Sequence, residues 1–207
     1  MKVSLPKQNE PQIATLSKAG KESLWRLLST IDGSEEPPRD VFVLLDGAMV
    51  RQLPDFLEDE EVEHAPLIPP ENEEPEEVTR CTYLARVESA SAPVAEWMMK
   101  HGWGANWGIW ISAPAGTPMD DLLSHLREMA QVRLPDGRIV FFRYYDPRVW
   151  RAFFPTCDMP QHQHLFRLQL FYGCENADGT ALIIDEMKDG NPERTEHSLE
   201  ADTTSTE

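Results

Sequence analysis

The chain has 207 residues, 41% of them hydrophobic, and a formal net charge of −17 at pH 7. This length and composition suffice to bury the core of one domain, and they exclude both a wholly disordered chain and a disulfide miniprotein. The negative charge argues against nucleic acid or an anionic membrane as a partner, because both would repel it.

Several absences point to the cytoplasm. No apolar run approaches the ~20 residues that a membrane span needs, and the N-terminus shows no apolar segment of a secretory signal. The three cysteines have no tight pairing, which suits reduced thiols: Cys81, Cys157 and Cys174.

The excess charge is concentrated in two segments. Residues 55–77 carry eleven acidic residues and no Lys or Arg, and residues 188–207 carry six acidic and two basic residues. Neither segment shows apolar periodicity, so we expect an acidic, proline-rich loop over 59–77, with Leu67 and Ile68 pinned to the core, and a disordered tail over 188–207.

The apolar pattern in chain order predicts strands that alternate with helices, followed by a hairpin. Helices are expected at 17–31, 93–101, 118–132 and 147–154, and strands at 41–45, 80–87, 107–112, 139–145, 164–174 and 180–187. The strands at 41–45, 107–112 and 139–145 are apolar on both faces, which predicts burial on both sides.

These elements predict an α/β fold in which helices flank both faces of a mixed sheet and an antiparallel hairpin ends the domain. The expected organisation is a disordered N-terminus over 1–16, a single α/β domain over 17–187, and the disordered tail.

One cluster of residues could bind a metal or act as a nucleophile. Cys157, Asp158, His162 and His164 lie within eight residues, but their spacing matches no common zinc pattern and no orienting partner accompanies the cysteine. We therefore expect neither a metal nor any other cofactor, and no catalytic residue.

The most specific segment runs from Phe141 to Val149, with the sequence FFRYYDPRV. Asp146 is a good helix N-cap, Pro147 suits a first helical turn, and either Arg143 or Arg148 could pair with the Asp146 carboxylate. A role for Asp146 as general base is the alternative, but the structural role is favoured.

This segment, together with VFVLLDGA at 41–48 and CTYLARV at 81–87, resembles the adaptor-chaperone family of bacterial type VI secretion. The family long carried only a domain-of-unknown-function label. The resemblance covers about residues 24–174 and makes the following its signature positions: Arg143, Tyr145, Asp146, Pro147 and Arg148.

The resemblance implies a non-enzymatic cytoplasmic protein that binds a toxic effector and loads it onto the spike (valine-glycine repeat) protein. Tryptophan is common at interface hot spots, so the candidate partner-binding residues are Trp97, Trp103 and Trp150, with Trp103 in a glycine loop expected to be exposed. Two alternatives stay open: an immunity protein that neutralises a toxin, and a metal-dependent hydrolase that uses Cys157, His162 and His164.

Overall fold

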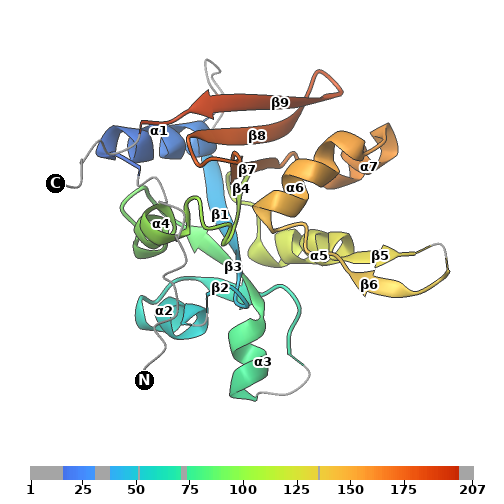
Figure 1. The fold of residues 1–207 in the computed structure, drawn as a ribbon, viewed down its shortest axis with the longest axis horizontal. Coiled ribbons are helices and arrows are strands. Elements are labelled where there is room, and N and C mark those ends of the chain that lie inside the picture. The colour runs from blue at the N-terminus through green and yellow to red at the C-terminus, as the bar shows by residue number, and fades with distance from the viewer. Residues whose placement is uncertain (1–15, 31–37, 51, 71–73, 135, 201–207) are drawn as a thin grey trace, which may run out of the picture.

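The computed structural model describes residues 16–30, 38–50, 52–70, 74–134 and 136–200. Its centre is a seven-stranded sheet in the order β2-β3-β1-β4-β7-β8-β9, and a separate two-stranded sheet pairs β5 with β6 (Figure 1). The strands are β1 (Arg39–Asp46), β2 (His64–Pro66), β3 (Thr82–Val87), β4 (Gly108–Pro114), β5 (Gln131–Arg133), β6 (Ile139–Phe141), β7 (Phe171–Glu175), β8 (Ala181–Lys188) and β9 (Asn191–Ser198).

Every pair of neighbouring strands in the large sheet is antiparallel. Strands β3 and β4 lie on opposite sides of β1, so they run in the same direction, and the chain crosses from one to the other through α4 (Pro93–Trp97). This crossover explains why the sequence alternates between strand and helix as a parallel sheet would.

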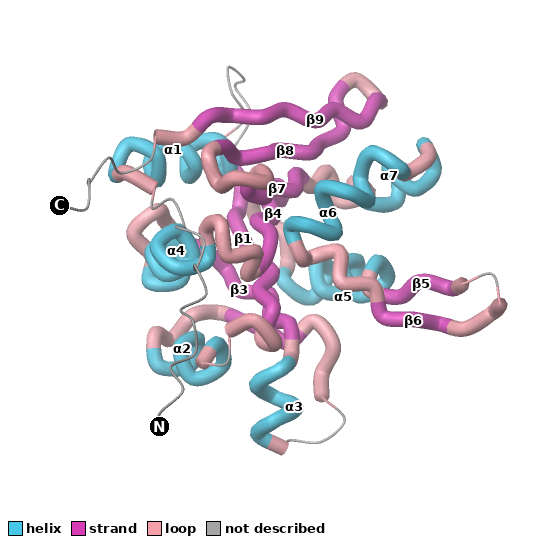
Figure 2. The backbone as a smooth tube through the Cα atoms, viewed as in Figure 1, coloured by secondary structure: helices cyan, strands magenta, loops and turns pink. Residues whose placement is uncertain are grey.

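Helices cover both faces of the large sheet (Figure 2). One face packs against α1 (Lys18–Ser29), α2 (Leu53–Asp59), α4 and the π-helical turn Met98–Gly102. The other face packs against α5 (Met119–Met129), α6 (Pro147–Phe153), the 3-10 turn Phe154–Thr156 and α7 (Met159–Leu165). A further helix, α3 (Pro75–Arg80), buries none of its residues.

The two cores follow from the alternation of side chains along the strands. On β1, Phe42 and Leu44 join the core under α5, whereas Val41, Val43 and Leu45 join the core under α1 and α4. The predicted fold class is confirmed: strands and helices form an α/β fold with helices on both faces and a C-terminal antiparallel hairpin. None of the described helices is long and apolar enough to cross a membrane.

The expectation of a buried strand over 139–145 is wrong. Only Ile139–Phe141 is a strand, and it pairs with β5 in a hairpin outside the large sheet. Gly137, at φ 85°, lies in the turn between them, and the hairpin pairing leaves β6 outside the large sheet. The side chains of Ile139 and Phe141 are exposed as a result.

The expectation of a disordered tail is also wrong for residues 188–200. Residues Asn191–Ser198 form β9, which pairs with β8 along its whole length, and Leu199 is buried. Backbone pairing with β8 orders this segment, and a partly buried ion pair anchors it: Arg194 donates to both carboxylate oxygens of Asp185, at 2.6 and 2.8 Å. Residues 201–207 lie outside the described part of the chain.

Smaller differences concern the flanking segments. Residues 1–15 lie outside the described part of the chain, but Leu16, also expected to be disordered, is buried. The acidic segment over 59–77 was expected to be a loop, but it contains β2, which pairs with β3, and the first residues of α3. Leu67 is buried, as predicted, whereas Ile68 is exposed.

The predicted strand over 164–174 begins only at Phe171, because His164 and Leu165 end helix α7. The strand predicted over 180–187 is β8.

Candidate functional site

The signature segment forms the junction between the β5–β6 hairpin and α6. Asp146 is the N-cap of α6 and accepts from the Arg148 backbone N–H at 2.9 Å, while Pro147 occupies the first turn. The Arg148 guanidinium donates to both carboxylate oxygens of Asp146, at 2.9 and 2.7 Å. Burial opposes ionisation of Asp146, but these hydrogen bonds outweigh it and lower the pKa of the carboxyl. The structure thus selects Arg148 as the partner of Asp146.

Arg143 pairs instead with Asp46, at the end of β1. Its guanidinium donates to a carboxylate whose side chain is 3% exposed, and the same carboxylate accepts from the Ala48 backbone N–H at 3.0 Å. Burial alone would lower the pKa of Arg143, yet the neighbouring Asp46 charge raises it. Sequence analysis missed this partner because 97 residues separate Asp46 from Arg143.

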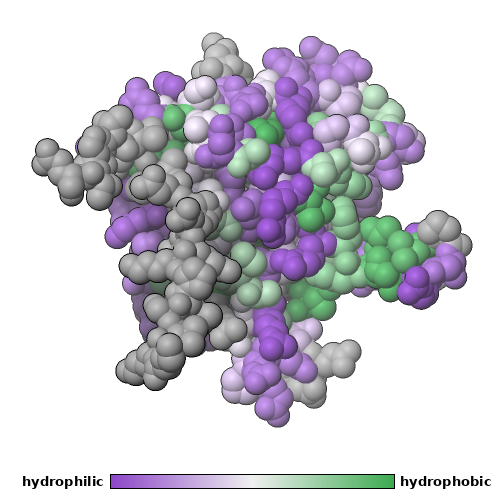
Figure 3. All heavy atoms as spheres, in the orientation of Figure 1, coloured by the Kyte–Doolittle hydropathy of each residue, from purple (hydrophilic) through white to green (hydrophobic). Residues whose placement is uncertain are grey.

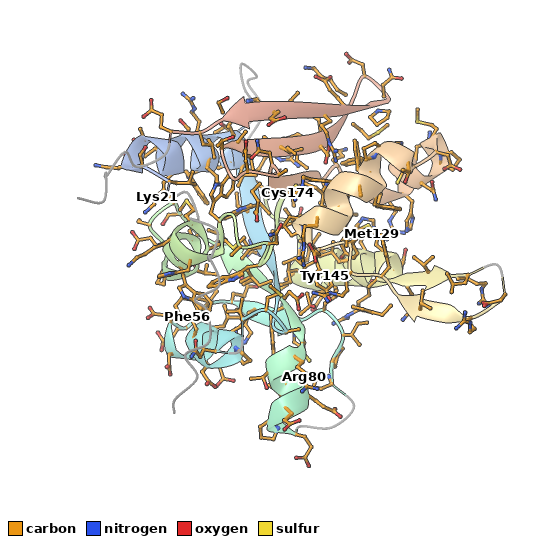
Figure 4. The ribbon with its side chains drawn as sticks, in the orientation of Figure 1. Lys21, Phe56, Arg80, Met129, Tyr145 and Cys174 are labelled. Atoms are coloured by element: carbon orange, nitrogen blue, oxygen red, sulfur yellow. The ribbon has the colours of Figure 1, made fainter. Side chains whose placement is uncertain are left out.

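Tyr145 completes the cluster from the buried side. It is 3% exposed and hydrogen-bonds to Thr82 on β3, and Figure 4 shows it between α5 and the sheet. The signature residues therefore join the end of β1, the start of β3 and the start of α6. This arrangement fixes the hairpin's base, which is a structural role.

Two of the three tryptophans proposed as partner contacts are buried, so that expectation is wrong for Trp103 and Trp150. The Trp103 indole N–H donates to the Gly179 carbonyl at 2.7 Å, which closes the glycine loop over the β7–β8 turn. The Trp150 indole N–H donates to Asp185 at 2.7 Å in the core beneath α6. Both rings stabilise the fold.

Trp97 is half-buried and is the remaining candidate of the three. Its ring stacks on Phe56 at a centroid distance of 4.0 Å and meets Trp107 edge-on at 5.2 Å. It also lines a hollow of about 380 Å³ whose other walls are mostly polar or charged, with Lys100 and His101 among them.

The cluster around Cys157 does not assemble into one site. Asp158 and Gln161 form a capping box at the start of α7, and the buried His162 hydrogen-bonds to the Phe154 carbonyl at 3.1 Å. Burial and the nearby Asp158 charge raise the pKa of Cys157 to about 11, so its thiol is protonated at neutral pH. His164 points elsewhere, toward Glu128 at 3.8 Å.

The β5–β6 hairpin carries an exposed apolar surface that sequence analysis did not identify. Ile139 is 57% exposed, Phe141 47% and Val132 38%. The register places Ile139 and Phe141 on one face and Val132 on the other. In Figure 3 the hairpin projects from the molecule, with hydrophobic residues on its inner part and hydrophilic residues toward its tip. The sequence clue was the Asp136-Gly137 turn between two short apolar runs, a hairpin pattern.

A pocket of about 420 Å³ opens at the base of this hairpin. Its walls come from β5, α5, α7 and the signature segment, and they are mainly apolar. Met129, labelled in Figure 4, lies at the end of α5 where this wall meets the hairpin. We call the pocket together with Val132, Ile139 and Phe141 the hairpin surface. The other apolar residues that line the pocket are Phe142, Tyr144, Phe153, Pro160 and Leu165.

Residues 41–164 match the family described as Domain of unknown function (DUF4123). The match covers more than half of the chain, and the chain therefore belongs to this family. The matched region includes both ion pairs of the signature segment and all of the hairpin surface except Leu165. No curated protein and no solved structure matches the chain.

Proposed function

We propose that this protein is a cytoplasmic adaptor-chaperone of type VI secretion, which binds a toxic effector and loads it onto the spike (valine-glycine repeat) protein. Family membership and the resemblance of the signature segment support the proposal. The observation that carries it is the hairpin surface, where the apolar side chains of Ile139 and Phe141 are exposed together on one face of the hairpin. Such a patch is typical of a protein-binding site.

The arrangement suits binding better than catalysis. The carboxylates of Asp46 and Asp146 already accept hydrogen bonds from arginine side chains and backbone N–H groups. The Cys157 thiol is protonated. The hairpin surface instead offers apolar area beside a pocket, which is how binding hot spots are built. We therefore propose a non-enzymatic role in which the hairpin inserts against the effector and shields its apolar surface before delivery.

The test is a pull-down from a lysate of the source bacterium with three tagged proteins. These are the wild type, the double variant Ile139→Ser/Phe141→Ser, and the control Met49→Ser, which removes an apolar side chain that is 44% exposed outside the hairpin surface. We expect the wild type and the control to capture a toxin and a spike protein, and the double variant to lose the toxin.

Two results would contradict the proposal. Equal capture by a correctly folded double variant would show that the hairpin surface is not the effector site. Capture of a toxin without any spike protein, even after cross-linking, would favour an immunity protein instead.

A further inference from the structure

Two histidines and a glutamate meet at the outer wall of the hairpin pocket, where α7 lies against α5. His125 and Glu128 lie about one turn apart on α5, and His164 comes from α7. One ring nitrogen or carboxylate oxygen from each residue lies within 4.8 Å of the other two. Imidazole nitrogen and carboxylate oxygen are both common zinc ligands.

His125 is prepared for coordination by its surroundings. The residue is fully buried, and its Nε2 lies 3.0 Å from the Leu165 carbonyl, which can only accept, so Nε2 carries the proton. Nδ1 therefore retains a lone pair, yet it has no hydrogen-bond partner. Metal-bound histidines commonly show this pattern, with one N–H on a backbone carbonyl and the other nitrogen on the ion.

The other two groups are free to adjust. Their side chains are about half exposed, and His164 Nε2 lies 3.8 Å from Glu128 Oε2. Ligands around a tetrahedral zinc ion, at ~2.0–2.1 Å from it, lie ~3.4 Å apart, so small rotations of exposed side chains suffice. Arg167 competes for the same carboxylate, because its Nη1 lies 3.1 Å from Glu128 Oε2.

We propose that His125, Glu128 and His164 bind a divalent transition-metal cation, with Zn²⁺ favoured by the ligand set. The ion would bridge α5 and α7 and so fix the wall of the hairpin pocket to which Glu128 and His164 both contribute. Three protein ligands leave a fourth position for water or for a side chain of a bound protein. The site itself does not rest on the proposed adaptor function.

The test uses the full chain after treatment with a chelator, titrated with Zn²⁺ in a calorimeter, with Co²⁺ absorption as a second readout of coordination. We expect one equivalent to bind with saturation. His164→Asn and Glu128→Gln should each weaken binding by at least ~tenfold, whereas the control His101→Asn, an exposed histidine elsewhere, should leave it unchanged. These exposed positions carry the test because substitution of His125 disturbs the core.

Arg167→Gln supplies a further readout of a different kind. It frees the Glu128 carboxylate and removes a positive charge from the site, so Zn²⁺ should bind more tightly than to the wild type. Absence of saturable binding, or binding that neither His164→Asn nor Arg167→Gln changes, would overturn the proposal. Either result would leave the adaptor function to be judged by its own pull-down.

Discussion

Strand β9 and the β5–β6 hairpin are both peripheral, yet their composition and their attachment are opposite. β9 is polar and acidic but is held along its length by β8 and by the Arg194–Asp185 pair. The hairpin is apolar at Ile139 and Phe141 but pairs only with itself and leaves those side chains exposed. Composition alone would assign the first to solvent and the second to the core.

The comparison shows that a buried charge can hold a strand in place even where the strand has few apolar residues. Asp185 is fully buried between β9 and α6, where Arg194 and Trp150 satisfy its carboxylate. Removing any partner would leave a charge in a medium of low dielectric. The exposed side chains of the hairpin, by contrast, contribute little to folding and are available to a partner.

The largest expected effect is the loss of the β9 anchor. Arg194→Ala should lower the free energy of unfolding by about 3–5 kcal/mol, because it leaves the Asp185 carboxylate buried without its ion-pair partner. Chemical denaturation of the variant would measure this loss. Ser198→Ala, at an exposed position of the same strand, is the control. A change below about 1 kcal/mol for Arg194→Ala would mean that the pair does not hold the strand.

Glu175 is a buried carboxylate in which only one oxygen accepts a hydrogen bond. It accepts from the Asn106 backbone N–H at 2.9 Å, whereas its second oxygen has no partner. Burial raises its pKa from 4.5 to about 7. Between these two pH values the folded protein holds a proton that the unfolded chain releases, so stability falls as pH rises through this window.

Glu175→Gln should remove that dependence, because the amide is neutral at every pH and its oxygen can still accept from Asn106. Relative to the wild type, the variant should gain up to about 3 kcal/mol between pH 5 and pH 8. Urea denaturation of both proteins at several pH values would measure the difference. A difference that stays constant with pH would show that Glu175 ionises normally.

A smaller effect is expected where the hairpin joins α6. Asp146→Ala removes an N-cap, at about 1 kcal/mol, and an ion pair whose arginine side chain is 57% exposed, which adds at most about 1 kcal/mol. Asp146→Asn keeps the cap and should lose less. Thermal melting of the two variants would separate the contribution of the cap from that of the ion pair. Equal losses of stability in both variants would show that the charge, not the cap, matters.

The smallest effect on stability should come from the hairpin itself. Ile139→Ser/Phe141→Ser should change the free energy of unfolding by less than about 0.5 kcal/mol per site, because each side chain is already about half exposed to water. Denaturation of the double variant would check this. A loss of several kcal/mol would place these residues in the core and remove the contrast with β9.

Local patterns predicted the elements whose contacts lie close in sequence. The helix predicted at 17–31 is α1, which Ser17 caps and whose buried side includes Leu24 and Leu28. Asp146 likewise caps α6, two residues from the N–H that it accepts from. In each case the deciding interaction lies within a few residues, so propensity and periodicity suffice.

Contacts between distant residues were not predictable in the same way. The burial of Trp103 depends on the Gly179 carbonyl, 76 residues away, and the Arg143–Asp46 pair spans 97 residues. The order of β9 depends on its pairing with β8 and on the Arg194–Asp185 pair, and a segment without apolar periodicity indicates neither. For the hairpin surface, the sequence shows the turn but not whether the strands beside it reach the central sheet.

The two ends of the described chain are tied to each other. The Ser17 backbone N–H donates to the Glu200 carbonyl at 3.0 Å, and a Cβ added at Gly20 would lie 2.3 Å from the same oxygen. The first and last described segments of the chain therefore lie next to each other. A circular permutant that links these ends and opens at the Gly116 turn, where added atoms meet open space, should retain the native topology. The chain would then begin and end at the Gly116 turn, and a partner could be fused there instead of at the original ends.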